Sequence, residues 1–173
     1  MKYMKPKIYE SYPIWTVILV IILFLAIYIA GAYVMFRLHL IMGIIYILYL
    51  VLLEFFVYKG ACPHCYYYGK VCFSGRGKLA KILYKKGDPK EFCKREMKFK
   101  DFVPQLIVVA VPVIVGIALL FSRGFHVLTL IAVLYPVLNW FAINPILYGK
   151  LACPHCKQGS ICCPALKFFG NKK

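Results

Sequence analysis

The stretch SYPIWTVILVIILFLAIYIAGAYVMF, residues 11–36, is almost entirely apolar and contains no charged side chain. Such a run is longer than the roughly 18–20 residues that cross a bilayer as an α-helix. It is also too long for the core of a cleaved signal peptide, which has roughly 7–15 apolar residues, although Ala30-Gly31-Ala32 resembles a cleavage site. We therefore interpret it as a membrane-spanning helix.

Three further stretches have the same character. Residues 38–58 carry a single acid, Glu54, whereas 102–122 and 124–149 carry no Asp, Glu, Lys or Arg. Because the backbone must satisfy its own hydrogen bonds in hydrocarbon, the expected fold is an all-α integral membrane protein. We predict four transmembrane helices, near residues 13–36, 38–58, 103–122 and 125–148.

The composition agrees with a multi-pass membrane protein. Of the 173 residues, 62% are hydrophobic and the formal net charge is +16, whereas soluble domains have about 45–50% apolar residues. Lys and Arg number three before the first span, twelve within residues 59–100 and five after the fourth span, with one in each remaining connection. The positive-inside rule therefore predicts that the N-terminus, the central loop and the C-terminus lie on the cytoplasmic side of the cell membrane. Anionic lipid headgroups, not nucleic acid, are the expected partner of this charge.

The chain contains an internal duplication. A shift of 91 residues, the separation of Cys62 and Cys153, places Cys62-Pro63-His64-Cys65 on Cys153-Pro154-His155-Cys156 and Cys72 on Cys163. We expect two tandem repeats, 1–101 and 102–173, each with a helical hairpin (13–58 and 103–148) followed by a C-P-H-C-x6-C loop. Two spans separate the motifs, so both are predicted on one membrane face, as in parallel-topology repeats.

The first repeat carries a basic insert before the third span. Within it, Leu79, Ile82 and Leu83 fall on one helical face. This pattern suits a short helix on the lipid headgroups, or a solvated helix packed on the cysteine region. The basic side chains expected to face lipid are Arg76, Lys78, Lys81 and Lys85.

The eight cysteines form two candidate ligand sets, since zinc and iron–sulfur clusters both commonly take four thiolates. Zinc in a structural role is the first choice of cofactor, and [4Fe-4S] clusters serving electron transfer are the second. Each half closes its own site, or the two C-x2-C pairs join in one site; in the second set one of two adjacent cysteines is spare, and the duplication favours Cys163 as the ligand. A cytoplasmic location argues against structural disulfides. The sets are Cys62, Cys65, Cys72 and Cys93, and Cys153, Cys156, Cys162 and Cys163.

Thiol–disulfide chemistry is a further alternative. The four residues CPHC resemble the active-site motif of bacterial periplasmic disulfide-forming oxidoreductases of the thioredoxin class, which place the motif between a strand and a helix. That resemblance implies a membrane thiol–disulfide oxidoreductase. His64 and His155 are candidate metal ligands or groups that tune the pKa of the thiols. A redox or scaffold partner in the membrane is expected, and the sequence assigns no catalytic residue or substrate.

Few polar residues lie within the spans. Glu54 is expected to be a functional intramembrane acid, or to reach the interface and pair with Lys59 or Lys150. Asn144 lies at a similar depth in the fourth span and is predicted to pair with Glu54. Pro136 and Pro145 predict kinks in this span.

Overall fold

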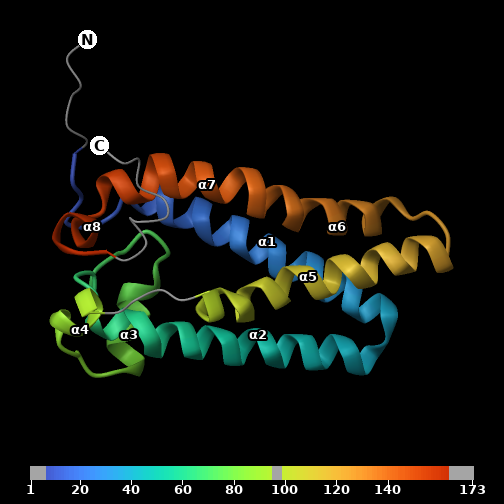
Figure 1. Ribbon diagram of the computed structural model, residues 1–173, viewed down its shortest axis with the longest axis horizontal. Coiled ribbons are helices and arrows are strands. Elements are labelled where there is room, and N and C mark those ends of the chain that lie inside the picture. Colours follow the sequence, from blue (N-terminus) through green and yellow to red (C-terminus); the bar gives the residue numbers. More distant parts are fainter. Residues whose placement is uncertain (1–6, 95–98, 164–173) are drawn as a thin grey trace, which may run out of the picture. The chain divides into compact units, whose positions relative to one another are not determined.

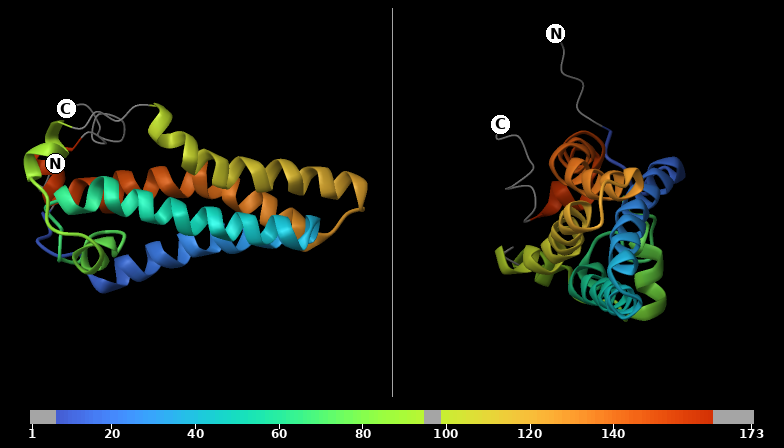
Figure 2. Two further views of the ribbon diagram at one scale, coloured as in Figure 1. Left: turned by 90° about the horizontal axis from the view of Figure 1, so that it is seen from below. Right: turned by 90° about the vertical axis from the view of Figure 1, so that its right-hand side faces the viewer.

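The computed structural model describes residues 7–94 and 99–163, and within these ranges it contains helices but no β-strand (Figures 1 and 2). Four helices are long and apolar enough to cross a membrane: Ile14–Leu38, Leu40–His64, Lys100–Ser122 and Val127–His155. The prediction of an all-helical chain with four such helices is therefore confirmed. The first three candidate spans contain α1 (Ile14–Leu38), α2 (Leu40–Ala61) and α5 (Phe99–Ser122), and the short helices α3 (Arg76–Leu83) and α4 (Pro89–Lys94) lie between α2 and α5.

The fourth span is irregular. It begins as α6 (Val127–Leu138), widens into a π-helix at Asn139–Ile143, returns briefly to α7 (Asn144–Ile146) and widens again at Leu147–Ala152. Pro136 and Pro145 lie at these transitions, and proline removes a helical N–H donor and crowds the preceding turn. The prolines predict distortion of this span, and the structure shows that the helix distorts by π-type widening.

The chain divides into two compact units. Unit 1 comprises Met1–Ile21, Val57–Met97 and Asn144–Lys173, and unit 2 comprises Ile22–Phe56 and Lys98–Ile143. Each unit takes segments from both halves of the sequence. The expected repeats, 1–101 and 102–173, therefore stay a prediction about duplication. Residues 1–6 and 164–173, whose lysines contribute to the predicted topology, lie outside the described residues.

Unit 2 consists of apolar helical segments. Val34, Leu119 and Ala132 form a buried core cluster, whereas large apolar side chains such as Phe121 are exposed on the outside. The turns of its two hairpins lie at the same end of the unit (Figure 1), where the Arg123 guanidinium donates a hydrogen bond to the carbonyl of Arg37 at 2.8 Å. An apolar exterior is what a lipid-facing surface requires.

One tyrosine in unit 2 repairs a backbone defect. Pro112 lies inside α5 and has no N–H to donate, so the carbonyl of Val108, four residues earlier, loses its helical partner. The Tyr46 hydroxyl donates to this carbonyl at 2.9 Å. Gly31 lets Tyr46 reach it, because a Cβ at Gly31 would lie 2.1 Å from the tyrosine oxygen.

Candidate functional site

Each CPHC motif forms the same turn at the end of a long helix. Cys62–His64 and Cys153–His155 are single 3₁₀ turns, each with proline near its start. In both, the N–H of the second cysteine donates to the carbonyl of the first at 3.3 Å. Proline fixes φ at a position whose N–H would otherwise be unsatisfied. The repeated sequence therefore gives repeated local structure within unit 1.

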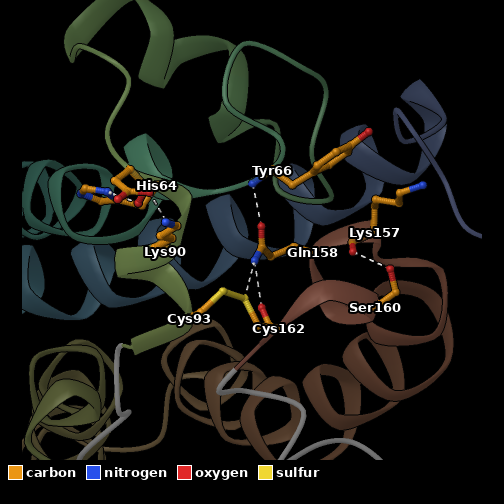
Figure 3. Close-up of a disulfide and its surroundings, with 9 residues drawn as sticks. His64, Tyr66, Lys90, Cys93, Lys157, Gln158, Ser160 and Cys162 are labelled. Carbon is orange, nitrogen blue, oxygen red and sulfur yellow. Dashed lines mark hydrogen bonds between the residues drawn. A yellow bond between two sulfur atoms is a disulfide. The ribbon is translucent and has the colours of Figure 1, made fainter.

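The residues that follow the two motifs contact each other reciprocally. The N–H of Tyr66 donates to Oε1 of Gln158 at 2.7 Å (Figure 3), and the N–H of Lys157 donates to the Tyr67 hydroxyl oxygen at 2.9 Å. The 91-residue shift places Tyr66 on Lys157 and Tyr67 on Gln158. In each repeat, the N–H of the residue after the motif donates to the side chain of the second residue after the motif in the other repeat. Such reciprocity is the signature of a two-fold relationship between the motifs.

The two histidines share one contact, a backbone carbonyl oxygen at Nδ1, and differ in their other neighbours. Nδ1 of His64 lies 3.0 Å from the carbonyl oxygen of Asp88, and Nδ1 of His155 lies 2.7 Å from that of Lys7. A carbonyl oxygen only accepts, so Nδ1 carries the proton in both rings. Nε2 then remains available to a metal or a neighbouring thiol. Glu91 also lies 3.2 Å from Nδ1 of His64, and Tyr9 stacks on the ring of His155.

The structure departs from the expected division into four cysteines per half. Cys93 and Cys162 form a disulfide with their Cα atoms 5.4 Å apart (Figure 3). Neither cysteine has a cysteine counterpart in the duplication, because Val71 corresponds to Cys162 and Cys93 lies in the insert of the first repeat. As a disulfide, this pair cannot supply thiolate ligands. The six remaining cysteines, two repeat-related sets of three, form no disulfide: Cys62, Cys65 and Cys72, and Cys153, Cys156 and Cys163.

The first set is partly buried and receives hydrogen bonds from backbone N–H groups. Burial raises the pKa of the Cys65 thiol to about 12, the N–H of Tyr67 lowers it, and the neighbouring thiols of Cys72, Cys156 and Cys62 raise it further. The N–H of Gly77, at the start of α3, donates to Sγ of Cys72 at 3.2 Å. N–H donors favour the charged form of a thiol, whereas burial without a counter-ion disfavours it.

The second set has the same character. Burial raises the pKa of the Cys156 thiol, while hydrogen bonds from the N–H groups of Gly159 and Gln158 lower it. Cys163 lies close enough to Cys153 and Cys156 to interact electrostatically with both thiols. Within the described ranges, however, no three His, Cys, Asp or Glu side chains are gathered closely enough to hold a metal ion. The metal roles of these cysteines and histidines stay predictions.

Helix α3 packs through its small residues. Gly77 and Ala80 are buried, and a Cβ at Gly77 would lie 2.2 Å from the carbonyl oxygen of Tyr67. The apolar face is exposed, with Ile82 at 80% and Leu79 at 50% of their full accessibility. Helix α3 also contacts the Cys62–His64 turn, and its Gly77 N–H donates to Sγ of Cys72. A helix on the lipid headgroups and a solvated helix packed on the cysteine region therefore both stay predictions. The basic positions on or beside it are Arg76, Lys78, Lys81 and Lys85.

The predicted polar pair in the spans joins residues of different units and stays a prediction. In unit 2, Glu54 accepts a hydrogen bond from the Tyr28 hydroxyl at 2.6 Å. In unit 1, the side-chain oxygen of Asn144 is buried and has no hydrogen-bond partner among the residues that the structure describes.

Sequence reasoning missed the residues that join the two motifs. Gln158 is 4% exposed, and its amide also donates to the carbonyl of Cys162 at 2.8 Å and approaches the Cys162 sulfur at 3.5 Å. Glu10 accepts hydrogen bonds from Tyr66 and Lys157 and ties the N-terminal segment to both repeats. The 91-residue shift aligns Tyr66 and Tyr67 with Lys157 and Gln158, but unlike residues at equivalent positions give no similarity signal.

No protein-family model, curated protein or solved structure matches this chain.

Proposed function

We propose that the chain is a multi-pass membrane protein whose unit 1 binds zinc through two repeat-related sets of three thiolates, with a structural role. The sets are Cys62, Cys65 and Cys72, and Cys153, Cys156 and Cys163. The observation that carries this proposal is the pattern of N–H donors directed at sulfur in both sets. These donors partly offset the burial that raises the pKa of the thiols, and a metal cation would stabilise their charged form.

The donor chemistry suits zinc. Soft thiolates select zinc or iron–sulfur clusters over hard cations. Three thiolates leave one position of a tetrahedral zinc ion, for which Nε2 of His64 or His155 is the nearest candidate in sequence. A zinc-ligating histidine ordinarily donates its other N–H to a carbonyl or carboxylate, and both rings meet a carbonyl through Nδ1. Zinc binding would add folding free energy to unit 1.

The proposed setting is the cell membrane. The four apolar helices would form two parallel-topology hairpins, with the basic N-terminus, central segment and C-terminus in the cytoplasm. The exposed apolar face of α3, bordered by Arg76, Lys78, Lys81 and Lys85, would lie on anionic headgroups, which attract basic residues by about 1 kcal/mol each. In this arrangement zinc would link the segments that follow the cytoplasmic ends of the second and fourth spans.

Metal analysis of the purified chain, together with its absorption spectrum, tests the proposal. The expected result is zinc bound to a colourless protein, and release of the metal by a chelator should lower the thermal unfolding temperature. Iron with broad visible absorption would instead support the iron–sulfur alternative and electron transfer to a membrane partner. A chain that binds neither metal when purified under reducing conditions would contradict both.

Sidedness is tested independently of the metal. In sealed vesicles of known orientation, a membrane-impermeant maleimide should reach metal-free Cys62 and Cys153 only from the cytoplasmic side. Labelling from the opposite side would contradict the proposed topology and leave the zinc proposal standing.

A further inference from the structure

The disulfide lies outside the duplicated pattern. Cys93 is in α4 (Pro89–Lys94) and Cys162 directly follows α8 (Lys157–Ile161), so the bond joins segments 69 residues apart. If unit 1 faces the cytoplasm, as proposed above, a permanent disulfide is unexpected, because cellular thiols reduce exposed disulfides there. A disulfide that occurs in such a compartment is typically transient and takes part in redox chemistry.

The two sulfur atoms are not equivalent. Cys93 is exposed, whereas Cys162 is partly buried. The amide of buried Gln158 points at Cys162 (Figure 3), with Nε2 3.5 Å from Sγ. Gln158 is itself held by the N–H of Tyr66, which donates to Oε1 at 2.7 Å. An incoming thiol can therefore reach Cys93 more easily than Cys162. The Gln158 amide lies where it can donate to a thiolate at Cys162.

The charge around Cys93 favours an anionic thiol. Lys94 follows Cys93, and Lys90 precedes it by three residues, about one helical turn, in α4. Asp88 is occupied as the cap of this helix, since its carboxylate accepts from the N–H of Lys90 at 2.9 Å. Glu91 lies 3.2 Å from His64. Among the described residues of α4, Lys90 and Lys94 are the basic side chains nearest to Cys93 in sequence.

We infer that Cys93–Cys162 is a thiol–disulfide exchange site for anionic low-molecular-weight thiols of the glutathione type, separate from the two cysteine sets. The thiolate of the first molecule attacks Sγ of Cys93, the S–S bond breaks, and its electron pair passes to Sγ of Cys162, where the Gln158 amide stabilises the thiolate. A second thiolate attacks the sulfur of the bound molecule and releases Cys93. The net reaction converts two thiols and the protein disulfide into one small-molecule disulfide and two protein thiols. Gln158 is a positioning residue in this scheme.

Differential alkylation and mass spectrometry of the full chain in detergent, equilibrated in glutathione buffers, test the inference. Cys93 and Cys162 should be linked in oxidising buffer and become half-reduced within the range of buffers that cells maintain. Cys162→Ser should trap glutathione on Cys93, whereas Cys93→Ser should accumulate much less on Cys162. Ser160→Ala, in the neighbouring α8, is the control and should leave the linkage intact.

A conservative variant probes Gln158. Gln158→Glu keeps the oxygen that accepts from Tyr66 but replaces the amide donor by a negative charge, so reduction should be about tenfold slower. A purely structural role of Gln158 would leave this rate, measured on the folded chain, unchanged.

Three results would overturn the inference: a linkage that resists every glutathione buffer, equal attachment of glutathione to both cysteines, or cysteines unmasked by a chelator instead of a reductant. Zinc content measured on the same samples keeps this outcome distinct from that of the metal proposal. Cys93→Ser and Cys162→Ser should retain their zinc.

Discussion

At the scale of single residues, the cysteine-rich face of unit 1 depends on side chains that serve two segments at once. Gln158 joins the first motif to the disulfide, and Tyr12 donates to the carbonyl of Ala152 at 2.7 Å. Glu10 receives hydrogen bonds from Tyr66 and Lys157 and lies 3.6 Å from the ammonium of Lys70. These contacts fix loops around a buried aromatic cluster in which Tyr12 packs on Tyr67 and Phe73.

Glu10 gives a prediction at this scale. The hydrogen bond from Tyr66, followed by that from Lys157, lowers the pKa of Glu10 from 4.5 to about 2. Because the folded-state pKa is depressed, the stabilising contact is complete above pH 4.5 and is lost as the pH falls toward 2. Tyr66→Phe should move the pKa of Glu10, followed by NMR, toward 4.5. The change should exceed that caused by Lys157→Met. An unaltered Glu10 titration in Tyr66→Phe would show that this contact does not form.

At the scale of elements, prolines inside the long helices leave backbone carbonyls without their helical N–H donors, and the helices accommodate this in different ways. In α5, the carbonyl freed by Pro112 is satisfied by Tyr46, whereas the fourth span widens into π-helix beside Pro136 and Pro145. Helix α3 instead uses Gly77 and Ala80 for close packing and leaves its apolar face outside.

Tyr46→Phe should destabilise the chain by about 1–3 kcal/mol, because the Val108 carbonyl is left unsatisfied where no water can replace the hydroxyl. Pro112→Ala supplies a helical N–H to the same carbonyl. Tyr46→Phe should therefore cost much less in a Pro112→Ala background. Unfolding measured in detergent for the four proteins of this cycle gives the coupling. Additive effects would mean that the tyrosine does not compensate for the proline.

The lipid contact of α3 is tested with inserted tryptophans in vesicles that contain brominated phosphatidylglycerol. Ile82→Trp should be quenched strongly, beyond the background from Trp15 and Trp140. Lys81→Trp is the comparison, because the Lys81 stem approaches Gly69 and lies beside the apolar face, so quenching there should be weaker than at position 82. Equal quenching at positions 81 and 82 would argue against docking through the apolar face.

At the scale of the whole molecule, the sequence predicted the four apolar helices, because they depend on local patterns. Uncharged runs specify spans through desolvation, and Cys-Pro-His-Cys specifies its turn through proline. The pairing of Cys93 with Cys162 could not be predicted, since it depends on contacts between distant segments. The role of Gln158 was hidden for the same reason, and its equivalent in the first repeat, Tyr67, is chemically different.

In the proposed function, each repeat provides three cysteines, one histidine and a reciprocal hydrogen bond to the other repeat. The two cysteines outside this pattern are bonded to each other. A metal function and a thiol-exchange function can therefore reside in separate cysteines of one unit.

The zinc content of paired variants tests the central claim most directly. The reduced wild-type chain should bind one zinc ion per repeat, Cys65→Ser and Cys156→Ser should each lose one, and the double variant should bind none. Cys93→Ser should retain both ions. If either single substitution removes all the zinc, the cysteines form one joint site, and if the wild-type chain binds no zinc, the account is contradicted.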